Sequence, residues 1–331
     1  MNINLSSHKN GKKAKLYLIY SWQGKRNKKL KNTKHAFRLN FSALNGKDSR
    51  CNLKCFNCHK DYFDVTHLID ETKSMSFTDA IEFMYQTLGE EIKNFDKIHI
   101  SGHAEPTMIG RERFIKEVKA LREKFPELPI ALTTNGTYLK DIRDDFLAIS
   151  NTYINLSLHH LAYLKTKWFN QLCTLDEEKR KRVELNIIID PEIIENFKEI
   201  FSFLINHKIS AKFFHRLEEN QPQKVISDFI DFIRQNVYTF NINEYSDEKR
   251  YNFVINNEFT ISIKLPVDLA RRPQACLVCP MLKNCIESCW TSVRITPWYI
   301  KPCGLREDNV YLFSENSKLS LKEKLASGGK I

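Results

Sequence analysis

The first 47 residues contain no Asp or Glu, although they contain 12 Lys or Arg. The whole chain of 331 residues has a net charge of +11 at pH 7, and the rest of it nearly balances, with 39 basic and 40 acidic residues. A basic segment can bind nucleic acid or a phosphorylated molecule, or it can be a solvated arm. We favour a solvated basic arm over residues 1–34 and expect no nucleic-acid partner.

Long apolar runs are also missing. No stretch of about 18 apolar residues occurs, so we expect no transmembrane helix and no membrane partner. Residues 1–15 are polar and lack the apolar core of a signal peptide, which predicts a cytoplasmic protein. Hydrophobic residues make up 42% of the chain, which is too much for a disordered protein and enough for one large core.

The chain has nine cysteines, and in the cytoplasm clustered cysteines indicate metal ligands or catalytic groups rather than disulfides. Cys173 stands alone, and we expect it to be a buried apolar side chain. The other eight form two groups, the first with Cys51, Cys55 and Cys58, and the second with Cys276, Cys279, Cys285, Cys289 and Cys303.

Strand and helix patterns alternate over residues 36–236, and the first cysteine group follows the first predicted strand. The predicted strands are continuous apolar runs, which is typical of strands covered on both faces. Alternation of this kind predicts a parallel sheet with right-handed crossovers. Six units are too few for a closed eight-unit barrel of about 250 residues, so the predicted α/β fold is a partial (β/α)6 TIM barrel.

The pattern changes after residue 237. YTFNINEY and NEFTISIKL are expected to be antiparallel strands, and the second cysteine group follows them. We therefore predict a barrel over residues 35–237 and a C-terminal domain over residues 238–331 that contains a β-hairpin and a second metal site.

Cys51, Cys55 and Cys58 have the spacing CxxxCxxC, directly after the first predicted strand. Thiolates are the ligands of iron–sulfur clusters, and three of them bind three irons of a cubane and leave the fourth iron open to another ligand. Parallel α/β barrels place their chemistry at this end of the strands. Two alternatives stay open: a zinc site with His59 as fourth ligand, and a haem c attachment through CxxCH.

This motif resembles the signature of the radical S-adenosylmethionine (SAM) superfamily. The resemblance implies a 4Fe–4S cluster whose open iron binds the amino and carboxylate groups of SAM. Reductive cleavage of SAM then yields a 5′-deoxyadenosyl radical that abstracts hydrogen from a substrate. The resemblance also implies an external electron donor, such as a flavodoxin or ferredoxin. The family usually has an aromatic residue before the third cysteine, where this chain has Asn57.

Later segments resemble further elements of the same family. ISGHAEPT is similar to the family's GGEP element, which holds the SAM amino group, and LTTNG looks like its TTNG turn. INLSLHHL and ELNIII resemble its fourth and fifth strands. The resemblance implies SAM contacts at Gly102, Glu105, Thr134, Asn135, Ser157 and Asn186.

The second cysteine group resembles the auxiliary-cluster domains of radical SAM proteins, called SPASM or twitch. The upstream cysteine pair of a full SPASM domain is missing, so we expect one auxiliary 4Fe–4S cluster of the shorter twitch type. Five cysteines compete for at most four positions, and Cys279, Cys285 and Cys303 are favoured over Cys276 and Cys289. A structural zinc site is the alternative.

Arg38 and Arg294 resemble residues of the molybdenum-cofactor GTP 3′,8-cyclases. The C-x13-C spacing of Cys289 and Cys303 also resembles that family. The two arginines are our candidates for substrate contacts. The chain departs from that family because Arg294 is the one arginine between Cys289 and Cys303, where the family uses several arginines to read its nucleotide. Its Gly328-Gly329 pair is also followed by two more residues.

The leading hypothesis is therefore a radical SAM enzyme that abstracts hydrogen from a small-molecule substrate in a biosynthetic pathway. The substrate would be a nucleotide, a sugar or an amino-acid derivative. A peptide-modifying SPASM-type enzyme and a GTP 3′,8-cyclase-like enzyme are the alternative activities. A zinc-containing nucleic-acid-binding protein is the alternative outside enzymes.

Overall fold

The computed structural model describes residues 35–40, 51–55, 58, 75–88, 95–101, 104–216, 221–246, 250–265, 292–295, 299–301 and 311–312. The basic arm over residues 1–34 and all five cysteines of the second group lie outside these ranges. No helix among the described residues is long and apolar enough to cross a membrane.

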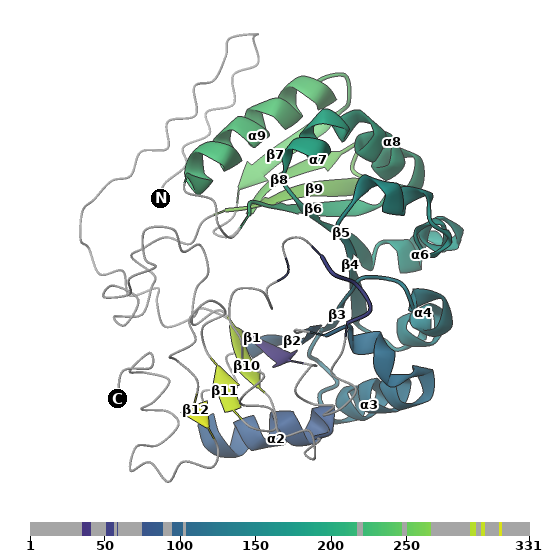
Figure 1. Cartoon of the computed structure of the whole chain (residues 1–331), viewed down its shortest axis with the longest axis vertical. Helices are drawn as coiled ribbons and strands as arrows, with labels where there is room; N and C mark the ends of the chain where they lie inside the picture. Colours follow the sequence, from purple (N-terminus) through teal and green to yellow (C-terminus); the bar gives the residue numbers. More distant parts are fainter. Residues whose placement is uncertain are drawn as a thin grey trace, which may run out of the picture.

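One curved sheet organises this part of the chain (Figure 1). Its centre is six parallel strands in sequence order, and their neighbours pair without exception in parallel register. They are β1 (His35–Asn40), β2 (Phe95–Ser101), β3 (Ile130–Thr134), β4 (Thr152–Leu158), β5 (Val183–Ile188) and β6 (Ser210–Phe214). The predicted partial (β/α)6 barrel is confirmed.

Both edges of this parallel sheet are extended by later strands. β9 (Phe259–Lys264) pairs with β6 and β10 (Ser292–Ile295) pairs with β1, both in parallel. Beyond β9 follow β8 (Arg250–Ile255) and β7 (Ile242–Ser246), and beyond β10 follow β11 (Tyr299–Lys301) and β12 (Tyr311–Leu312), all antiparallel to their neighbours. The sheet thus continues past residue 237, and the domain boundary there remains a prediction.

The strand prediction after residue 237 needs one correction. The two predicted segments contain β7 and β9, but these do not pair with each other, because β8 lies between them. β8 consists of the run RYNFVI, whose Tyr251, Phe253 and Ile255 are buried. This apolar run is what allows a third strand to join the packed sheet.

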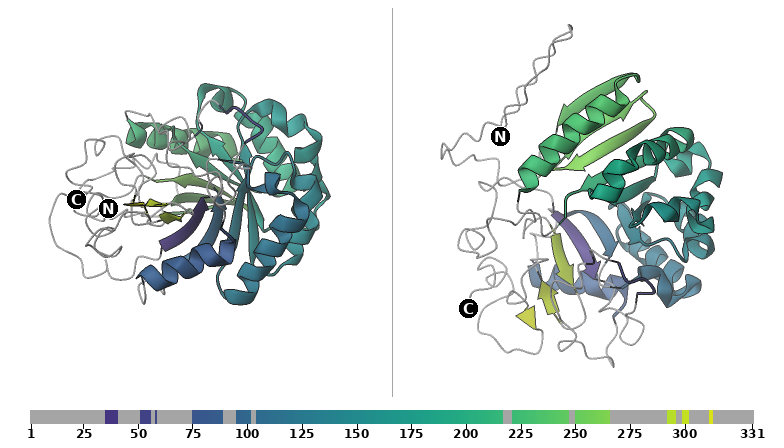
Figure 2. Two further views of the ribbon diagram at one scale, coloured as in Figure 1. Left: turned by 60° about the horizontal axis from the view of Figure 1, so that its bottom comes forward. Right: turned by 45° about the horizontal axis from the view of Figure 1, so that its top comes forward.

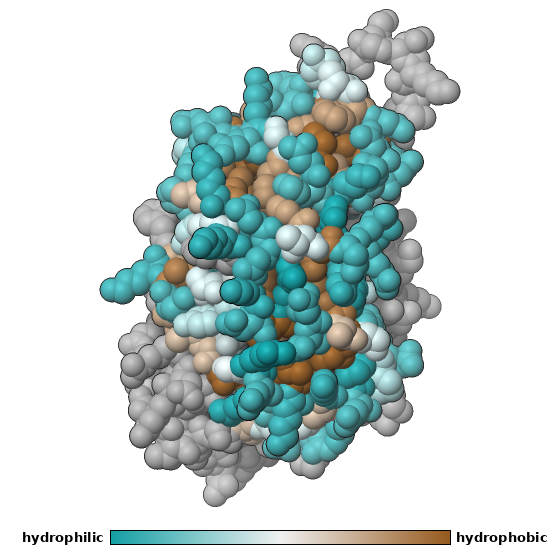
Figure 3. Space-filling model, turned by 90° about the vertical axis from the view of Figure 1, so that its right-hand side faces the viewer, coloured by the Kyte–Doolittle hydropathy of each residue, from teal (hydrophilic) through white to brown (hydrophobic). Residues whose placement is uncertain are grey.

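Helices cover the outer face of the sheet (Figures 1 and 2). The longer ones are α2 (Phe77–Leu88), α3 (Arg111–Lys124), α4 (Leu139–Ala148), α8 (Phe197–His207) and α9 (Pro222–Val237). Seen from the helical side, the surface is largely hydrophilic, with apolar residues showing between the polar ones (Figure 3). The helices therefore bury one apolar face against the strands, as their amphipathic sequences predict.

Helix is interrupted in two regions of the structure. The region 161–181 consists of short turns of helix, namely η7 (Leu161–Lys165), α5 (Lys167–Asn170), η8 (Gln171–Thr174) and α6 (Glu177–Arg180). The region 191–207 is divided at Asn196 into α7 (Pro191–Glu195) and α8. Asp190 caps α7 by accepting from the Ile193 N–H at 2.9 Å, and Pro191 occupies its first position.

A group of phenylalanines joins α8 and α9 to the sheet. The ring of Phe197 stacks on Phe201 at 5.6 Å between centroids and meets Phe232 edge-on at 5.2 Å. It also lies against Phe213 of β6 and Phe229 of α9. Phe197 is 1% exposed, so this group forms part of the core beneath the C-terminal half of the barrel.

Replacing Phe197 by alanine should lower the free energy of unfolding by about 3–5 kcal/mol, because it leaves a cavity among four other rings. Urea denaturation of the full chain under anaerobic conditions measures the change. Tyr238→Ala is the control, since Tyr238 is 78% exposed and should change the unfolding free energy by less than about 0.5 kcal/mol. Equal effects of the two substitutions would contradict the packing described here.

Candidate functional site

The first cysteine segment lies on the turn that follows β3. Asn135, in this turn, donates from Nδ2 to Asn52 Oδ1 at 2.9 Å and to Cys51 Sγ at 3.7 Å. Asn52 in return donates from its own Nδ2 to Thr137 Oγ1 at 2.9 Å. Side chains more than 80 residues apart in sequence thus hold the cysteines at the carboxyl end of a central strand.

The backbone of this turn explains its sequence. Gly136 has φ +84°, a left-handed conformation that glycine adopts without steric cost. Its N–H donates to Thr134 Oγ1 at 3.0 Å, and the N–H of Thr137 donates to Asn135 Oδ1 at 3.0 Å. The TNGT sequence therefore forms a turn whose own hydrogen bonds fix the direction of the Asn135 side chain.

Glu105 lies beneath the same turn and is almost completely buried. Its Oε1 accepts from Thr107 N at 3.2 Å, from Thr107 Oγ1 at 2.6 Å and from Thr134 Oγ1 at 2.6 Å. Its Oε2 accepts from the backbone N–H of Asn135 at 2.7 Å. Burial raises the pKa of Glu105, although the hydrogen bonds from Asn135, Thr107 and Thr134 act in the opposite direction.

These hydrogen bonds give Glu105 a structural role that the sequence resemblance did not imply. The sequence resemblance implied a contact with the SAM amino group, but the four hydrogen bonds above all come from protein donors. Thr134 likewise directs its hydroxyl to Glu105. Both residues hold the turn from inside, and a direct contact of either with SAM remains a prediction. Gly102 lies outside the described residues.

The inner face of the sheet carries polar side chains. Along β5 the buried residues Val183, Leu185 and Ile187 alternate with partly exposed ones that point to the other face, including Asn186. Ser157 is the register partner of Asn186 on β4, so these two predicted SAM contacts are brought together. The Asn186 Oδ1 atom is buried without a hydrogen-bond partner among the described residues, and a bound molecule could supply the missing donor.

Charged side chains follow on the same inner face. Lys212 of β6 is the register partner of Asn186 and forms an ion pair with Glu184, whose other oxygen lies 3.8 Å from Arg250 Nη1. The ammonium groups of Lys212 and Lys264 each lie 6.0 Å from the ring centroid of Phe214. The sequence motifs do not mark this group, although alternation along β5 and β6 places Glu184, Lys212 and Phe214 on one face.

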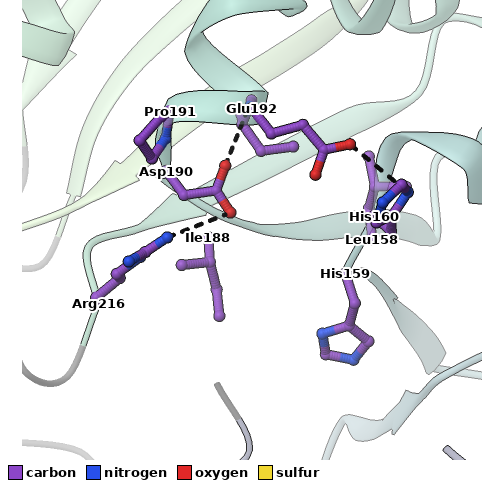
Figure 4. A pocket seen from close by; sticks show the side chains of 9 residues that line it. Leu158, His159, His160, Ile188, Asp190, Pro191, Glu192 and Arg216 are labelled. Atoms are coloured by element: carbon purple, nitrogen blue, oxygen red, sulfur yellow. Dashed lines mark hydrogen bonds and ion pairs between the residues drawn. The ribbon is translucent and has the colours of Figure 1, made fainter. Parts of the chain in front are cut away.

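A cavity of about 260 Å³ opens at the carboxyl ends of β4, β5 and β6 (Figure 4). Its polar lining comes from His159, His160, Asp190, Glu192 and Arg216. Asp190 lies 3.9 Å from Arg216, and Glu192 lies 3.5 Å from His160 Nδ1, while the ring of His159 points away from both pairs. The cavity is at the edge where parallel α/β barrels bind their ligands.

The cysteine segment is also close to η7. Burial raises the pKa of Tyr163, and the negative charges of Cys55 and Cys51 raise it further. The ring of Tyr163 lies 6.3 Å from that of His160, which lines the cavity. Tyr163 thus connects Cys51 and Cys55, which act on its pKa, with His160 of the cavity lining.

Comparison with known proteins adds independent findings. No protein-family model matches the chain. A probable GTP 3′,8-cyclase from Methanococcus aeolicus is 25% identical over 272 residues, which cover 79% of this chain and 84% of that protein. The GTP 3′,8-cyclase of Campylobacter jejuni subsp. doylei is 26% identical over 180 residues, so this chain spans about half of its length (53%).

Solved structures show the same fold. SuiB of Streptococcus suis bound to S-adenosylmethionine aligns with a TM-score of 0.51 at 15% identity, over 88% of this chain and 64% of that one. Native anSMEcpe with bound AdoMet and the Kp18Cys peptide also has a TM-score of 0.51 at 15% identity, over 88% of this chain and 80% of that one. The chain resembles the radical SAM enzymes in sequence and in fold. It is consistent with an enzyme of that class.

The resemblance to radical SAM enzymes implies that the chain binds a 4Fe–4S cluster and SAM. Cys51, Cys55 and Cys58 are each half-buried, Cys51 lies against the turn after β3, and their thiol groups are suited to iron. Within the described ranges, no three His, Cys, Asp or Glu side chains are gathered so that they could hold one metal ion. A cubane makes a different demand, because each cysteine binds its own iron.

For the two candidate substrate arginines, the structure gives the position on the strand and not the side chain. Arg38 of β1 and Arg294 of β10 are register partners, so both candidate substrate arginines occupy neighbouring strands. His99 of β2 is the next partner of Arg38 in the same row. Cys276, Cys279, Cys285, Cys289 and Cys303 lie outside the described residues, and their predicted cluster stays a prediction.

The stability of the turn should depend on pH through Glu105. Its pKa is raised in the folded protein, so the folded state binds more protons than the unfolded state above the ordinary value of 4.5. The wild-type protein should therefore lose unfolding free energy, relative to Glu105→Gln, as pH rises through the folded-state pKa. Urea midpoints of both proteins between pH 5 and pH 8 measure this difference. Glu112→Gln, at an exposed position of α3, should show no such trend, and parallel profiles for all three would contradict the prediction.

Proposed function

We propose that this chain is a radical SAM enzyme in which Cys51, Cys55 and Cys58 hold the 4Fe–4S cluster and the remaining iron binds SAM. The observation that carries the proposal is the contact of Asn135 with Cys51 and Asn52. It joins the start of the three-cysteine segment to the turn after β3, at the carboxyl ends of the parallel strands, where a cavity also opens. The cluster, when bound, supplies the electron that cleaves SAM and so starts hydrogen abstraction.

On this proposal, some residues of the chain contact SAM directly and others support the turn beside it. Ser157 and Asn186 offer a hydroxyl and an amide on the inner face of the sheet, and the partnerless Asn186 Oδ1 can accept from the SAM amino group. Glu105 and Thr134 act from below, by keeping the turn after β3 in place. Gly102 would let the backbone approach the ligand closely.

The charged inner face supports a small polar substrate. Glu184, Lys212, Arg250 and Lys264 present both signs of charge beside the ring of Phe214. A nucleotide, a sugar or an amino-acid derivative carries donors, acceptors or charges that such a wall can bind. Hydrogen abstraction from one of these molecules in a biosynthetic pathway is the reaction we propose.

The second cysteine group would hold an auxiliary 4Fe–4S cluster through Cys279, Cys285 and Cys303, together with Cys276 or Cys289. A flavodoxin or ferredoxin would supply electrons. A reducing compartment is needed for reactive thiolates and reduced clusters, and this supports a cytoplasmic location.

A GTP 3′,8-cyclase-like activity is the second candidate. The two matches to such cyclases favour it, as does the register pairing of Arg38 with Arg294. A cyclase-like enzyme would also hold the SAM-binding cluster through Cys51, Cys55 and Cys58, but its barrel would have to bind the triphosphate of GTP.

Replacing Cys55 by alanine should remove about four of about eight irons per chain and abolish SAM cleavage, since each cubane contains four irons. Anaerobic reconstitution, iron counting and assay of 5′-deoxyadenosine with dithionite measure both effects. Cys173→Ala is the control, because Cys173 lies in η8 outside the cysteine segment, and it should keep full iron and full cleavage. A wild-type protein that binds zinc in place of iron would refute the proposal.

GTP binding separates the two candidate activities. If the chain is cyclase-like, GTP should bind to the SAM-free holoprotein, and Lys212→Met should weaken binding by about tenfold or more through loss of a charge-assisted hydrogen bond. Isothermal titration calorimetry measures the affinity. Lys198→Met, at an exposed position of α8, should leave it unchanged. Absence of GTP binding would exclude the cyclase-like candidate and leave radical SAM chemistry in place.

A further inference from the structure

Asn135 has an unusually complete set of hydrogen bonds for a residue in a turn. Its side-chain Oδ1 accepts from the N–H of Thr137 at 3.0 Å and from the hydroxyl of Thr137 at 2.7 Å. Its Nδ2 donates to Asn52 at 2.9 Å and to Cys51 Sγ at 3.7 Å. Its backbone N–H donates to Glu105. Asn135 is 5% exposed, so these protein partners stand in place of water.

The orientation of the Asn135 amide follows from these partners. The backbone N–H of Thr137 can only donate, so the atom that faces it must be the oxygen. The –NH₂ group must then point to Asn52 and Cys51. A reversed amide would place two donors against each other and an acceptor against a thiolate.

Two of these bonds do more than stabilise the turn. The contacts with Thr137 are local, but the Nδ2 contacts reach 83 and 84 residues back along the chain. One of them ends on the sulfur of a predicted cluster ligand. A hydrogen bond to a ligating sulfur stabilises the extra negative charge of the reduced cluster and raises its reduction potential.

We propose that Asn135 is a positioning residue that sets the reduction potential of the cluster through Cys51 Sγ and is itself held in place by Glu105. This rests on the proposed function, because it requires Cys51 to bind iron. On this view Glu105 serves the cluster indirectly, by anchoring the backbone of Asn135. The amide then makes the cluster easier to reduce before SAM is cleaved.

The test uses the full chain, reconstituted anaerobically and without SAM. Asn135→Asp has the same size and can still accept from Thr137, but it replaces the N–H donor by a carboxylate oxygen beside the sulfur. Asn135→Ala removes the donor without adding charge. Thr137→Ser is the matched control, since it removes a methyl group from the same turn but keeps the hydroxyl that donates to Asn135 and accepts from Asn52.

The readout is a redox titration followed by electron paramagnetic resonance. The signal of this cluster is assigned by its absence from Cys55→Ala. We expect lower potentials for Asn135→Asp and Asn135→Ala, with the oxidised-to-reduced ratio at a fixed potential raised about two- to tenfold, as for the loss of one hydrogen bond. Thr137→Ser should have the wild-type potential. Selective loss of this cluster from both Asn135 variants, with Thr137→Ser fully loaded, would also support the proposal.

Wild-type potentials in fully loaded Asn135→Asp and Asn135→Ala would overturn the proposal. So would equal loss of the cluster from both variants and from Thr137→Ser, because the effect would then belong to the turn as a whole. A wild-type protein without iron at Cys51 would instead refute the proposed function. The iron count of the wild type separates these failures.

Discussion

The contact between the turn after β3 and the cysteine segment is the constraint on which the site depends. The described part of that segment, residues 51–55 and 58, contains no strand or helix that could position it. Asn135 supplies the position through Asn52 and Cys51, and Glu105 holds Asn135 from the other side. Because Glu105 is buried with four protein donors, the turn cannot shift without exposing or stranding a carboxylate. Rigid support of this kind is what a reactive centre needs from its surroundings.

The parallel sheet explains why the other groups meet there. Strands of one direction bring all their carboxyl ends to one edge, so residues from distant segments converge without contact in sequence. The turn after β3, the cavity at the ends of β4 to β6 and the His160–Tyr163 pair all lie at this edge. The outer face serves another purpose, because the helices and the phenylalanines around Phe197 bury the apolar side of the same strands. One sheet thus separates the stabilising core from the polar inner wall.

The apolar runs of the sequence were sufficient to predict six parallel units, because burial on both faces leaves a plain signal. The breaks at Asn196 and across residues 161–181 were not predictable from periodicity, since short helical turns keep the same apolar spacing. Two pairs of residues that the motifs indicate are neighbours in the structure, Asn135 with Cys51 and Ser157 with Asn186, while their contacts with a cluster or with SAM stay predictions. The motifs did not predict that Glu105 faces inward. The sequence shows that residue 105 is a glutamate, but it does not show whether the carboxylate binds a ligand or four donors of its own protein. The Glu184–Lys212 pair depends on strand register, which pairs Asn186 with Lys212 and cannot be derived from either strand alone.

The ion pair between Glu184 and Lys212 also bears on the choice between the proposed substrates. A triphosphate carries only negative charge, and a wall that binds it gains most from cations without a competing acid. Here Glu184 contacts Lys212 and lies near Arg250, so an anion entering this part of the barrel must compete with a carboxylate already in place. Repulsion from such a carboxylate is a means of rejecting one ligand in favour of another. A molecule with both donors and acceptors, such as an amino-acid derivative or a sugar, meets each charge with a matching group. The Glu184–Lys212 pair is thus one argument for the amino-acid derivative or sugar that we propose as substrate, while the sequence matches include GTP 3′,8-cyclases.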